Sequence, residues 1–306
     1  MCIPETYEVI CAGQAVLDCI TRGKETEPYK ENVYRAETIR LHPGGDAVNE
    51  ASALASLGIR TAVVCGLGKD LAGDAIVRLL TEAGVHTERI RRLPMDTPVA
   101  NLMVAKDGSR ISVNSRATEL PGYRIRPEEL AGAKIVSFAS LFRPPFADMA
   151  GVAALIRAAA AQHAVICCDT KLPLDGSIRL DALAEVLPMI DYLFPNEHEA
   201  AYYTGKETFP EMAAVFRSYG VKQVIIKAGA EGCYVSGPEG DFRVPAVPVE
   251  KVVDTTGAGD HFVAGFMAGI LQGASLRDCA ESGVRLAARA ITHTGGAGQK
   301  QAEQKQ

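Results

Sequence analysis

The sequence predicts an α/β fold: a three-layer α/β/α sandwich with a mainly parallel central sheet, completed by a small β-sheet lid. Short strand-like runs alternate with longer helical segments along the 306-residue chain. Most of these runs are apolar throughout, as expected for strands that are covered on both faces. Two other segments alternate polar and apolar residues, which indicates a second sheet with one face in water. Strand–helix alternation of this kind favours a parallel sheet between two helical layers.

The strands and helices are expected in a regular order. Strands of the central sheet are expected at 7–13, 61–66, 134–138, 164–169, 191–195 and 223–227, with a hairpin strand at 233–236. Helices are expected at 47–57, 72–83, 149–162, 180–187, 197–204 and 211–219, and two long helices at 259–272 and 275–292 finish the fold. The two alternating segments are 33–42 and 97–114, the second with a turn at 106–109.

The lid is expected to be discontinuous, built from about 14–43 and 97–118. Because both pieces follow early elements of the alternating core, we place the lid over the mouth of the active site. No internal repeat or long linker separates a second unit, so residues 1–306 are expected to form a single domain.

Composition and charge exclude several functional classes. Hydrophobic residues make up 47% and charged residues 23% of the chain, which are ordinary values for a soluble globular protein. A net charge of −5 gives no support to a nucleic-acid surface. No apolar stretch approaches the ~20 residues that span a bilayer, and residues 1–8 do not look like a signal peptide. The eight cysteines contain no Cys-x-x-Cys pair. We therefore expect a cytoplasmic protein with reduced thiols, no membrane contact and no nucleic-acid partner.

A stretch of small residues leads into an apolar helix near the end of the chain. Gly257, Ala258 and Gly259 are followed by Asp260 and by the apolar run 263–271. Free N–H groups and the positive end of the helix dipole attract an anion, and glycine lets phosphate oxygens approach closely. A carboxylate beside an anion site is unfavourable unless it has a task such as removing a proton. The segment therefore indicates phosphoryl transfer to a hydroxyl, although an ordinary helix start can have the same sequence.

Polar residues near the beginning of the chain are candidates for holding a polyol. Gly44 and Gly45 permit close backbone approach just before helix 47–57, and the amide of Asn49 both donates and accepts hydrogen bonds. Asp18 follows the first strand, where open α/β sheets bind ligands. A glycine-rich turn, a surface asparagine and a solvated loop aspartate are the structural alternatives.

Two more motifs follow strands of the predicted central sheet. Asn196 and Glu199 have the spacing of an N-cap and a capping box, which alone would explain them. Glu199 is also a candidate for lying beside a hydrated Mg²⁺ that nucleotide phosphates share. Lys227, Gly229 and Gly232 close the next strand with a loop that turns a hairpin and is a candidate border of a nucleotide.

Taken in this order, the motifs resemble those of the ribokinase-like carbohydrate kinases, also called the PfkB family. The C-terminal signature of that family is similar to residues 254–266, and its N-terminal glycine signature is similar to residues 44–58. Two further family motifs resemble residues 68–73 and the pair Asn196 and Glu199. The resemblance extends over nearly the whole chain.

The resemblance implies an ATP-dependent kinase that phosphorylates a hydroxyl of a sugar or a related alcohol. It implies that Asp260 is the catalytic base and that the backbone of Gly257, Ala258 and Gly259 forms an anion hole. It implies that substrate hydroxyls are bound by Asp18, Gly44, Gly45 and Asn49. It also implies that ATP is bordered by Asn196, Lys227, Gly229 and Gly232, and that Glu199 holds Mg²⁺ through water. Members of the family often hold a monovalent cation such as K⁺ beside the anion hole, bound largely by backbone carbonyls. Asp254 and Thr256, together with the segment 290–296, are the positions to examine for it.

The substrate stays open at this point. A nucleoside or sugar-acid kinase of the same superfamily, or a non-catalytic sugar-binding regulator, is the alternative to a ribokinase- or fructokinase-type enzyme. A nucleoside base needs an apolar or aromatic slot, and the aromatic residues near the lid pieces are Tyr29, Tyr34 and Tyr123. Arg116 and Arg124 flank the second lid segment, where an arginine would suit a carboxylate or phosphate.

The lid also predicts a quaternary structure. A sheet with one uncovered apolar face is usually covered in the assembled protein, so we expect a homodimer joined through the lid. The roles of Arg116, Lys171, which follows a predicted strand, and His261, which follows the candidate base, stay open.

Overall fold

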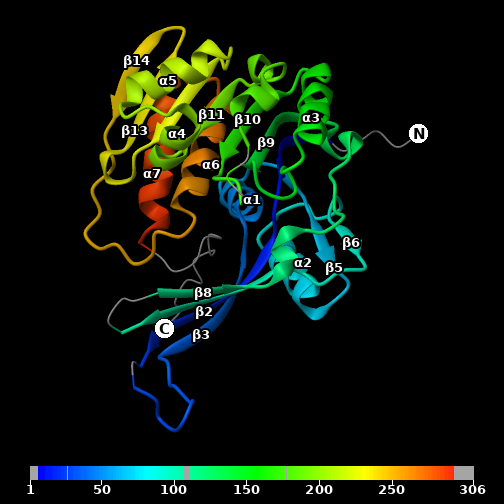
Figure 1. The fold of residues 1–306 in the computed structure, drawn as a ribbon, viewed down its shortest axis with the longest axis vertical. Coiled ribbons are helices and arrows are strands. Elements are labelled where there is room, and N and C mark those ends of the chain that lie inside the picture. The colour runs from blue at the N-terminus through cyan, green and yellow to red at the C-terminus, as the bar shows by residue number, and fades with distance from the viewer. Residues whose placement is uncertain (1–5, 26, 107–109, 175, 177, 293–306) are drawn as a thin grey trace.

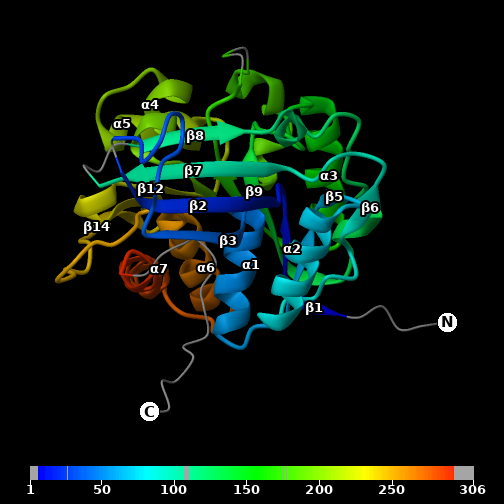
Figure 2. The same ribbon diagram turned by 90° about the horizontal axis from the view of Figure 1, so that it is seen from below.

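The computed structural model describes residues 6–25, 27–106, 110–174, 176 and 178–292, and every structural statement below refers to them. Its larger body has three layers, with a sheet between two groups of helices (Figures 1 and 2). One face carries α3 (Met149–Ala161), α4 (Glu197–Thr204) and α5 (Phe209–Ser218). The other carries α1 (Asp46–Ser56), α6 (Ala258–Leu271) and α7 (Leu276–Ala290). The predicted α/β/α sandwich is confirmed.

The central sheet has eight strands in the order β14-β13-β12-β11-β10-β9-β1-β4. From β4 to β12 neighbouring strands are parallel, and β13 and β14 are added antiparallel at one edge. The strands are β1 (Tyr7–Ala12), β4 (Thr61–Val64), β9 (Ala133–Leu141), β10 (Val165–Thr170), β11 (Tyr192–Phe194), β12 (Gln223–Lys227), β13 (Cys233–Gly237) and β14 (Gly240–Val244).

The second sheet is the lid, with the strand order β3-β2-β7-β8. Its strands are β2 (Val16–Lys24), β3 (Thr38–Gly44), β7 (Val99–Ala105) and β8 (Arg110–Asn114). It extends away from the larger body in Figure 1 and lies in front of it in Figure 2. β2 pairs antiparallel with β3 but parallel with β7, so two separate chain segments build one sheet.

Some local predictions differ from the structure. The alternating pattern at 33–42 becomes a strand only from Thr38, and β2 was not expected as a strand. The predicted turn at 106–109 falls mostly outside the described residues. A small parallel sheet of β5 (Gly66–Gly68) and β6 (Arg91–Leu93), beside α2 (Leu71–Glu82), was also not expected.

The predicted helix at 180–187 is wrong. Two separate 3-10 turns, Leu180–Leu183 and Leu187–Met189, occupy this region. Pro188 lies within the second turn, and its ring and missing N–H prevent an α-helix from passing through it. The other predicted helices are present, each within two residues at either end.

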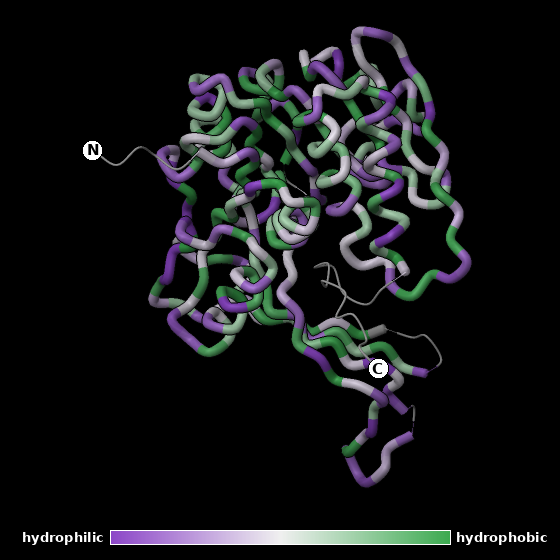
Figure 3. The backbone as a smooth tube through the Cα atoms, turned by 180° about the vertical axis from the view of Figure 1, so that it is seen from behind, coloured by the Kyte–Doolittle hydropathy of each residue, from purple (hydrophilic) through white to green (hydrophobic). Residues whose placement is uncertain are grey.

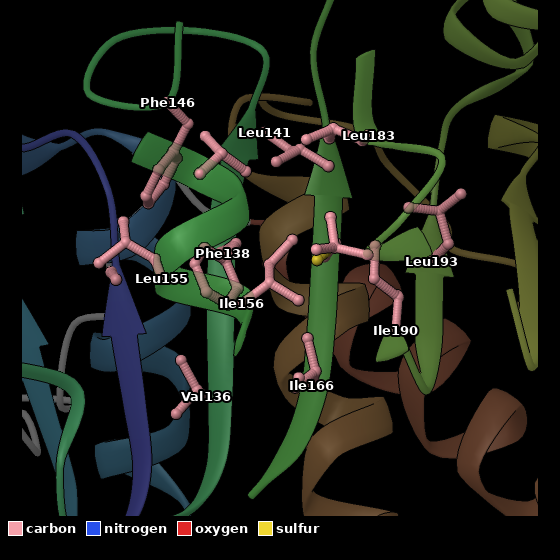
Figure 4. Packing of buried hydrophobic residues seen from close by; sticks show 14 of the residues in the cluster. Val136, Phe138, Leu141, Phe146, Leu155, Ile156, Ile166, Leu183, Ile190 and Leu193 are labelled. Carbon is pink, nitrogen blue, oxygen red and sulfur yellow. The ribbon is translucent and has the colours of Figure 1, made fainter. Parts of the chain in front are cut away.

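The core of the larger body lies on both sides of the central sheet. Figure 4 shows Leu155 and Ile156 of α3 packed against Val136, Phe138 and Ile166 of the sheet. Each fully buried side chain of this size contributes about 1.5–3 kcal/mol relative to an exposed one. Figure 3 shows hydrophobic stretches running through the interior, with hydrophilic ones along many outer loops. Within the described part of the chain, no helix is long and apolar enough to cross a bilayer.

Candidate active site

Asp260 lies in the first turn of α6, at the point where that helix meets α1. Gly257 is the N-cap and has a φ of 75°, a left-handed conformation that favours glycine. The Asp260 side chain is buried, and the Asn49 amide of α1 donates a 2.6 Å hydrogen bond to its Oδ2. Asn49, predicted to contact substrate, therefore holds the candidate base.

The environment of Asp260 favours its protonated form. Burial and the nearby Asp46 carboxylate raise the pKa of Asp260 to about 7, against the opposing effects of Lys171 and of the Asn49 hydrogen bond. A carboxyl group with a pKa near neutrality is well matched to accept a proton from a hydroxyl at neutral pH. Structural groups can also have displaced pKa values, so the geometry around Asp260 has to support the same role.

A cavity of about 520 Å³ lies between the lid and the larger body. The lid side contributes Asp18, and the body contributes Gly45, Asp46 and Lys171. Lys171 Nζ is 3.2 Å from Asp46 Oδ2, which also accepts a 2.7 Å hydrogen bond from Ser140 Oγ. Asp260 is not among the lining residues, but Asp46 and Lys171 both act on its charge, so it is adjacent to the cavity.

The residues predicted to hold substrate hydroxyls come together at the joint between lid and body. Gly45 caps α1 with a φ of 92°, and a β-carbon there would be 2.5 Å from the Gln14 carbonyl. A β-carbon on Gly44 would meet the Asp18 carboxylate, so the strand end and Asp18 are in contact distance. Burial, Asp46 and Asp254 raise the pKa of Asp18 to about 6. Asp18 and Gly45 thus line the cavity with Gly44 in contact with Asp18 behind them, and Asn49 does not line it.

Asn196 and Glu199 form the predicted capping box of α4. Glu199 N–H donates to Asn196 Oδ1 at 2.9 Å, and Asn196 N–H donates to Glu199 Oε2 at 2.9 Å. The same Oε2 accepts a 2.9 Å hydrogen bond from Thr170 Oγ1, at the end of β10. The cap therefore joins α4 to the strand that also ends beside the cavity.

Lys227 lies beside the glycine turn of α6. A β-carbon on Gly259 would be 3.4 Å from Lys227 Nζ, so the ammonium group is next to the proposed anion hole. Lys227 Nζ is 2.5 Å from Oδ1 of the fully buried Asp169. Burial opposes the charge of Lys227, but Asp169 and Glu199 keep its pKa above its ordinary value. Burial raises the pKa of Asp169 to about 6 in spite of this ion pair.

The other two glycines of the predicted nucleotide loop have different surroundings. Gly229 begins a 3-10 turn, and a β-carbon there would meet nothing within 4 Å. A β-carbon on Gly232 would lie 2.0 Å from the Val244 carbonyl oxygen, so Gly232 is required by the β13–β14 hairpin. Neither residue lines the cavity.

Asp254 and Thr256, two of the candidate cation ligands, precede the helix, whereas the third candidate segment, 290–296, lies outside the described residues from position 293 on. Thr256 N–H donates a 3.0 Å hydrogen bond to Asp254 Oδ1. Arg22 Nη2 of the lid strand β2 is 2.5 Å from Asp254 Oδ2. The Asp254 side chain is only 2% exposed, so both of its oxygens are engaged inside the protein.

The residues left open by the sequence separate into two groups. Arg116 and Lys171 line the cavity, as does Arg143, which also donates to the Leu172 carbonyl. Arg124 does not line it and donates instead to the Tyr123 carbonyl. The ring of His261 is buried with Nδ1 2.9 Å from the Gly257 carbonyl oxygen, a contact that braces the first turn of α6.

Three site residues were missed. Asp46 follows Gly44 and Gly45 directly, and this adjacency was an available signal. Asp169 ends an apolar strand beside Lys171, which was another. Arg22 had no local signal, because its position depends on the register of a strand that was not expected.

The described residues contain no group of three or more His, Cys, Asp or Glu side chains placed to hold a metal ion. Asp169 Oδ2 is nevertheless buried without a hydrogen-bond partner in the described structure, and Glu199 is close enough to raise the pKa of Asp169. Two carboxylates near each other beside the proposed anion hole offer the oxygen donors that a largely hydrated Mg²⁺ prefers.

Comparison with known proteins yields matches over most of the chain. A family model described as pfkB family carbohydrate kinase matches residues 7–302. The chain is 28% identical to the cytidine kinase of Thermococcus kodakarensis, covering 83% of this chain and 89% of that protein. It is also 28% identical to the ribokinase of Lactococcus lactis, covering 89% and 86%. The structure of Arabidopsis thaliana ribokinase complexed with ribose and ATP has a TM-score of 0.80 at 26% identity, covering 95% of this chain and 94% of that one.

Proposed function

Because the chain belongs to the pfkB family of carbohydrate kinases, we propose that it transfers the γ-phosphoryl group of ATP to a sugar hydroxyl, with Asp260 as the general base. The observation that carries this assignment is the buried Asp260 carboxylate at the glycine turn of α6, held by Asn49 and adjacent to a polar cavity. A non-catalytic regulator would have no use for a buried carboxylate with a raised pKa at this place.

Each step of the proposed phosphoryl transfer can be assigned to a side chain or backbone group near Asp260. Asp260 accepts the proton of the attacking hydroxyl, and the N–H groups of Gly257, Ala258 and Gly259 receive negative charge on the transferring phosphoryl group. Lys227, whose ammonium lies beside Gly259, adds a positive charge at the same place. Lys171, on the cavity side, offsets the charge of the ionised Asp260.

Glu199 and Asp169 are the residues that would hold Mg²⁺, through water and together with the phosphates of ATP. When bound, the ion would supply positive charge that offsets the negative charge of the phosphate groups. The Asn196–Glu199 cap fixes one of the two carboxylates, and Asn196 borders the nucleotide together with Gly229.

The wall of the cavity favours a polar substrate. Asp18 and the Gly44–Gly45 backbone would bind hydroxyl groups, and none of the described lining residues is aromatic. Tyr123, an aromatic residue expected near the lid, is instead buried in the core. This lining favours a sugar over a nucleoside, because a base would have no ring to stack on.

A second candidate, a sugar-acid kinase, is favoured by two arginines. Arg116 and Arg143 both line the cavity, and Arg116 has no hydrogen-bond or ion-pair partner in the described part of the chain. Guanidinium groups recognise carboxylates with two parallel hydrogen bonds. A substrate that carries a carboxylate in addition to hydroxyls would pair with these arginines.

We propose that two copies of the chain associate through the lid. The outer lid face consists of Ile39 and Leu41 on β3 and Ile111 and Val113 on β8, whose exposed fractions are 67%, 56%, 56% and 58%. β2 and β7 complete the face with Thr21 opposite Met103. Apolar side chains this exposed on one sheet face are typical of an interface.

A coupled assay that measures ATP consumption tests the function. Pentoses, hexoses, keto sugar acids and nucleosides would each be added to the purified protein. We expect turnover with a sugar or sugar acid, and turnover only with nucleosides would overturn the substrate proposal. Binding of a sugar without ATP consumption would support the regulator instead.

Asp260→Asn tests the role of the base. We expect the fold to persist and turnover to fall by ~10²–10⁴-fold, because proton transfer from the hydroxyl loses its acceptor. Asp96→Asn makes the same change at an exposed site and should retain wild-type turnover. Near-normal activity of Asp260→Asn would remove Asp260 from the mechanism.

A further inference from the structure

The contact between Arg22 and Asp254 joins the lid to the anion-hole segment. The two residues are 232 positions apart, yet Arg22 Nη2 is 2.5 Å from Asp254 Oδ2. The Arg22 side chain is 22% exposed and that of Asp254 is 2% exposed. An ion pair this close and this sheltered fixes the position of both groups more firmly than a surface pair does.

Each partner is attached to a part of the proposed site. Arg22 and Asp18 are four positions apart on β2, so both point to the same face of the lid. Asp254 accepts the Thr256 N–H, and Thr256 directly precedes the Gly257 cap of α6. The strand that contributes Asp18 to the cavity therefore also contacts the segment that leads into the anion hole.

This arrangement leaves Asp254 poorly suited to hold a monovalent cation. One oxygen is bound to the Thr256 N–H and the other to the guanidinium. A cation on Oδ2 would displace Arg22 or lie directly beside its positive charge. Arg22 Nε is itself buried with no hydrogen-bond partner among the described residues, so Asp254 is the main anchor of this side chain.

We propose that Arg22 takes the place of a monovalent cation beside the anion hole, and that the lid strand itself supplies the positive charge on Asp254. This inference rests on the proposed kinase function, since it assigns Arg22 to the phosphoryl-transfer site as a positioning residue. The anion-hole segment is then ordered by the lid, and K⁺ is not required.

Thermal unfolding in K⁺ tests the proposal without ATP or sugar. The unfolding midpoint would be measured as potassium chloride replaces N-methylglucamine chloride at constant ionic strength. We expect no K⁺-specific shift for the wild-type protein or for Arg22→Lys. Arg22→Met, which keeps the apolar stem and loses the charge, should have a lower midpoint that K⁺ raises in a saturable manner.

The matched control is Arg40→Met, on β3. Arg40 pairs with Ile20 and so lies on the same face of the lid as Arg22, but it is exposed. Its midpoint should not respond to K⁺. A K⁺-specific rise for the wild-type protein, or no K⁺ response in a folded Arg22→Met protein, would overturn the proposal. If Arg22→Met does not fold, the response of the wild-type protein to K⁺ still tests the proposal.

An activity measurement follows once a substrate is known. Arg22→Met should lose about 10²-fold in turnover from misplacement of the anion hole, and K⁺ should restore much of this loss. Turnover of the wild-type protein should be the same with and without K⁺. Failure of the sugar screen would leave the K⁺ response in thermal unfolding intact, so the two proposals can fail separately.

Discussion

Asp260 is stabilised in the protonated form by the same surroundings that support its proposed role as a base. Burial and Asp46 disfavour its charge, whereas Asn49 and Lys171 favour it. The resulting pKa of about 7 lies well above the ~3.9 of an unperturbed aspartate. At neutral pH the folded protein therefore contains a fraction of molecules in which Asp260, the proposed base, is protonated and unable to accept a proton.

The pH dependence of turnover should report this titration. We expect kcat/KM to rise as the pH increases through about 7 and then to level off, because only the ionised Asp260 accepts a proton. Asp18 and Asp169 both have pKa values of about 6 and should affect the lower end of the profile. A profile that is flat from the acidic side through neutrality would contradict the assignment of Asp260.

Stability should change with pH in the opposite direction. Because the pKa of Asp260 is raised on folding, its stabilising contribution is complete below the unfolded pKa of ~3.9 and is lost as the pH rises through about 7. Asp260→Asn lacks this loss. Its unfolding midpoint, measured against that of the wild-type protein, should therefore increase between about pH 5 and about pH 8. A constant difference would show that Asp260 does not titrate in this range.

At the scale of single residues, the sequence predicted which residues belong to the candidate site better than it predicted which of them contact each other. The glycines before Asp260, the Asn196–Glu199 pair and Lys227 were recognisable from local spacing. The Asn49–Asp260 hydrogen bond joins residues 211 positions apart and depends on how α1 packs against α6. No local pattern contains that information.

The secondary-structure elements show a similar division. Apolar strands and helices with regular periodicity were predicted because the spacing of their apolar residues indicates which side chains are buried. β2 was missed because Asp18, Thr21 and Arg22 interrupt its apolar residues, and only pairing with β3 and β7 makes it a strand. The false helix at 180–187 had suitable composition but was divided into two turns at Pro188.

Substitutions at the N-terminus of α4 can distinguish a capping role of Glu199 from a role in binding Mg²⁺. Glu199→Gln retains an oxygen that can accept from Asn196 N–H and Thr170 Oγ1, so we expect the free energy of unfolding to stay within about 1 kcal/mol of wild type. Its lost charge should raise the Mg²⁺ concentration that gives half-maximal turnover. Urea unfolding and a Mg²⁺ titration of activity measure the two effects.

Asn196→Ala is the complementary change at the same helix. It removes the cap but keeps the Glu199 charge, and should cost about 1 kcal/mol of stability. If Glu199→Gln left the Mg²⁺ requirement unchanged, capping alone would account for Glu199.

The described residues form a three-layer body with a buried core, together with a single-sheet lid whose outer face carries exposed apolar side chains. Replacing Ile39 and Val113 together by lysine places two charges on the outer lid face, and we expect a dimer to become a monomer. Light scattering coupled to size-exclusion chromatography measures the mass. Ser112→Lys adds a charge on the opposite face of β8 and should leave the dimer intact. A monomeric wild-type protein, or a dimer that survives both lysines, would contradict association through the lid.

The separation of lid and body also has an evolutionary consequence. Asp18 and Arg116 reach the cavity from the lid side, whereas Asp46, Lys171 and Asp260 belong to the body. Under the proposed function, mutations at the cavity-facing positions Asp18 and Arg116 would reshape the pocket for a new acceptor, while the glycine turn of α6 would keep its geometry as long as the Arg22–Asp254 contact is retained. The scaffold would thus diversify its substrates in small steps, because the proposed selectivity residues lie on the lid side of the cavity and the proposed base lies on a helix of the body.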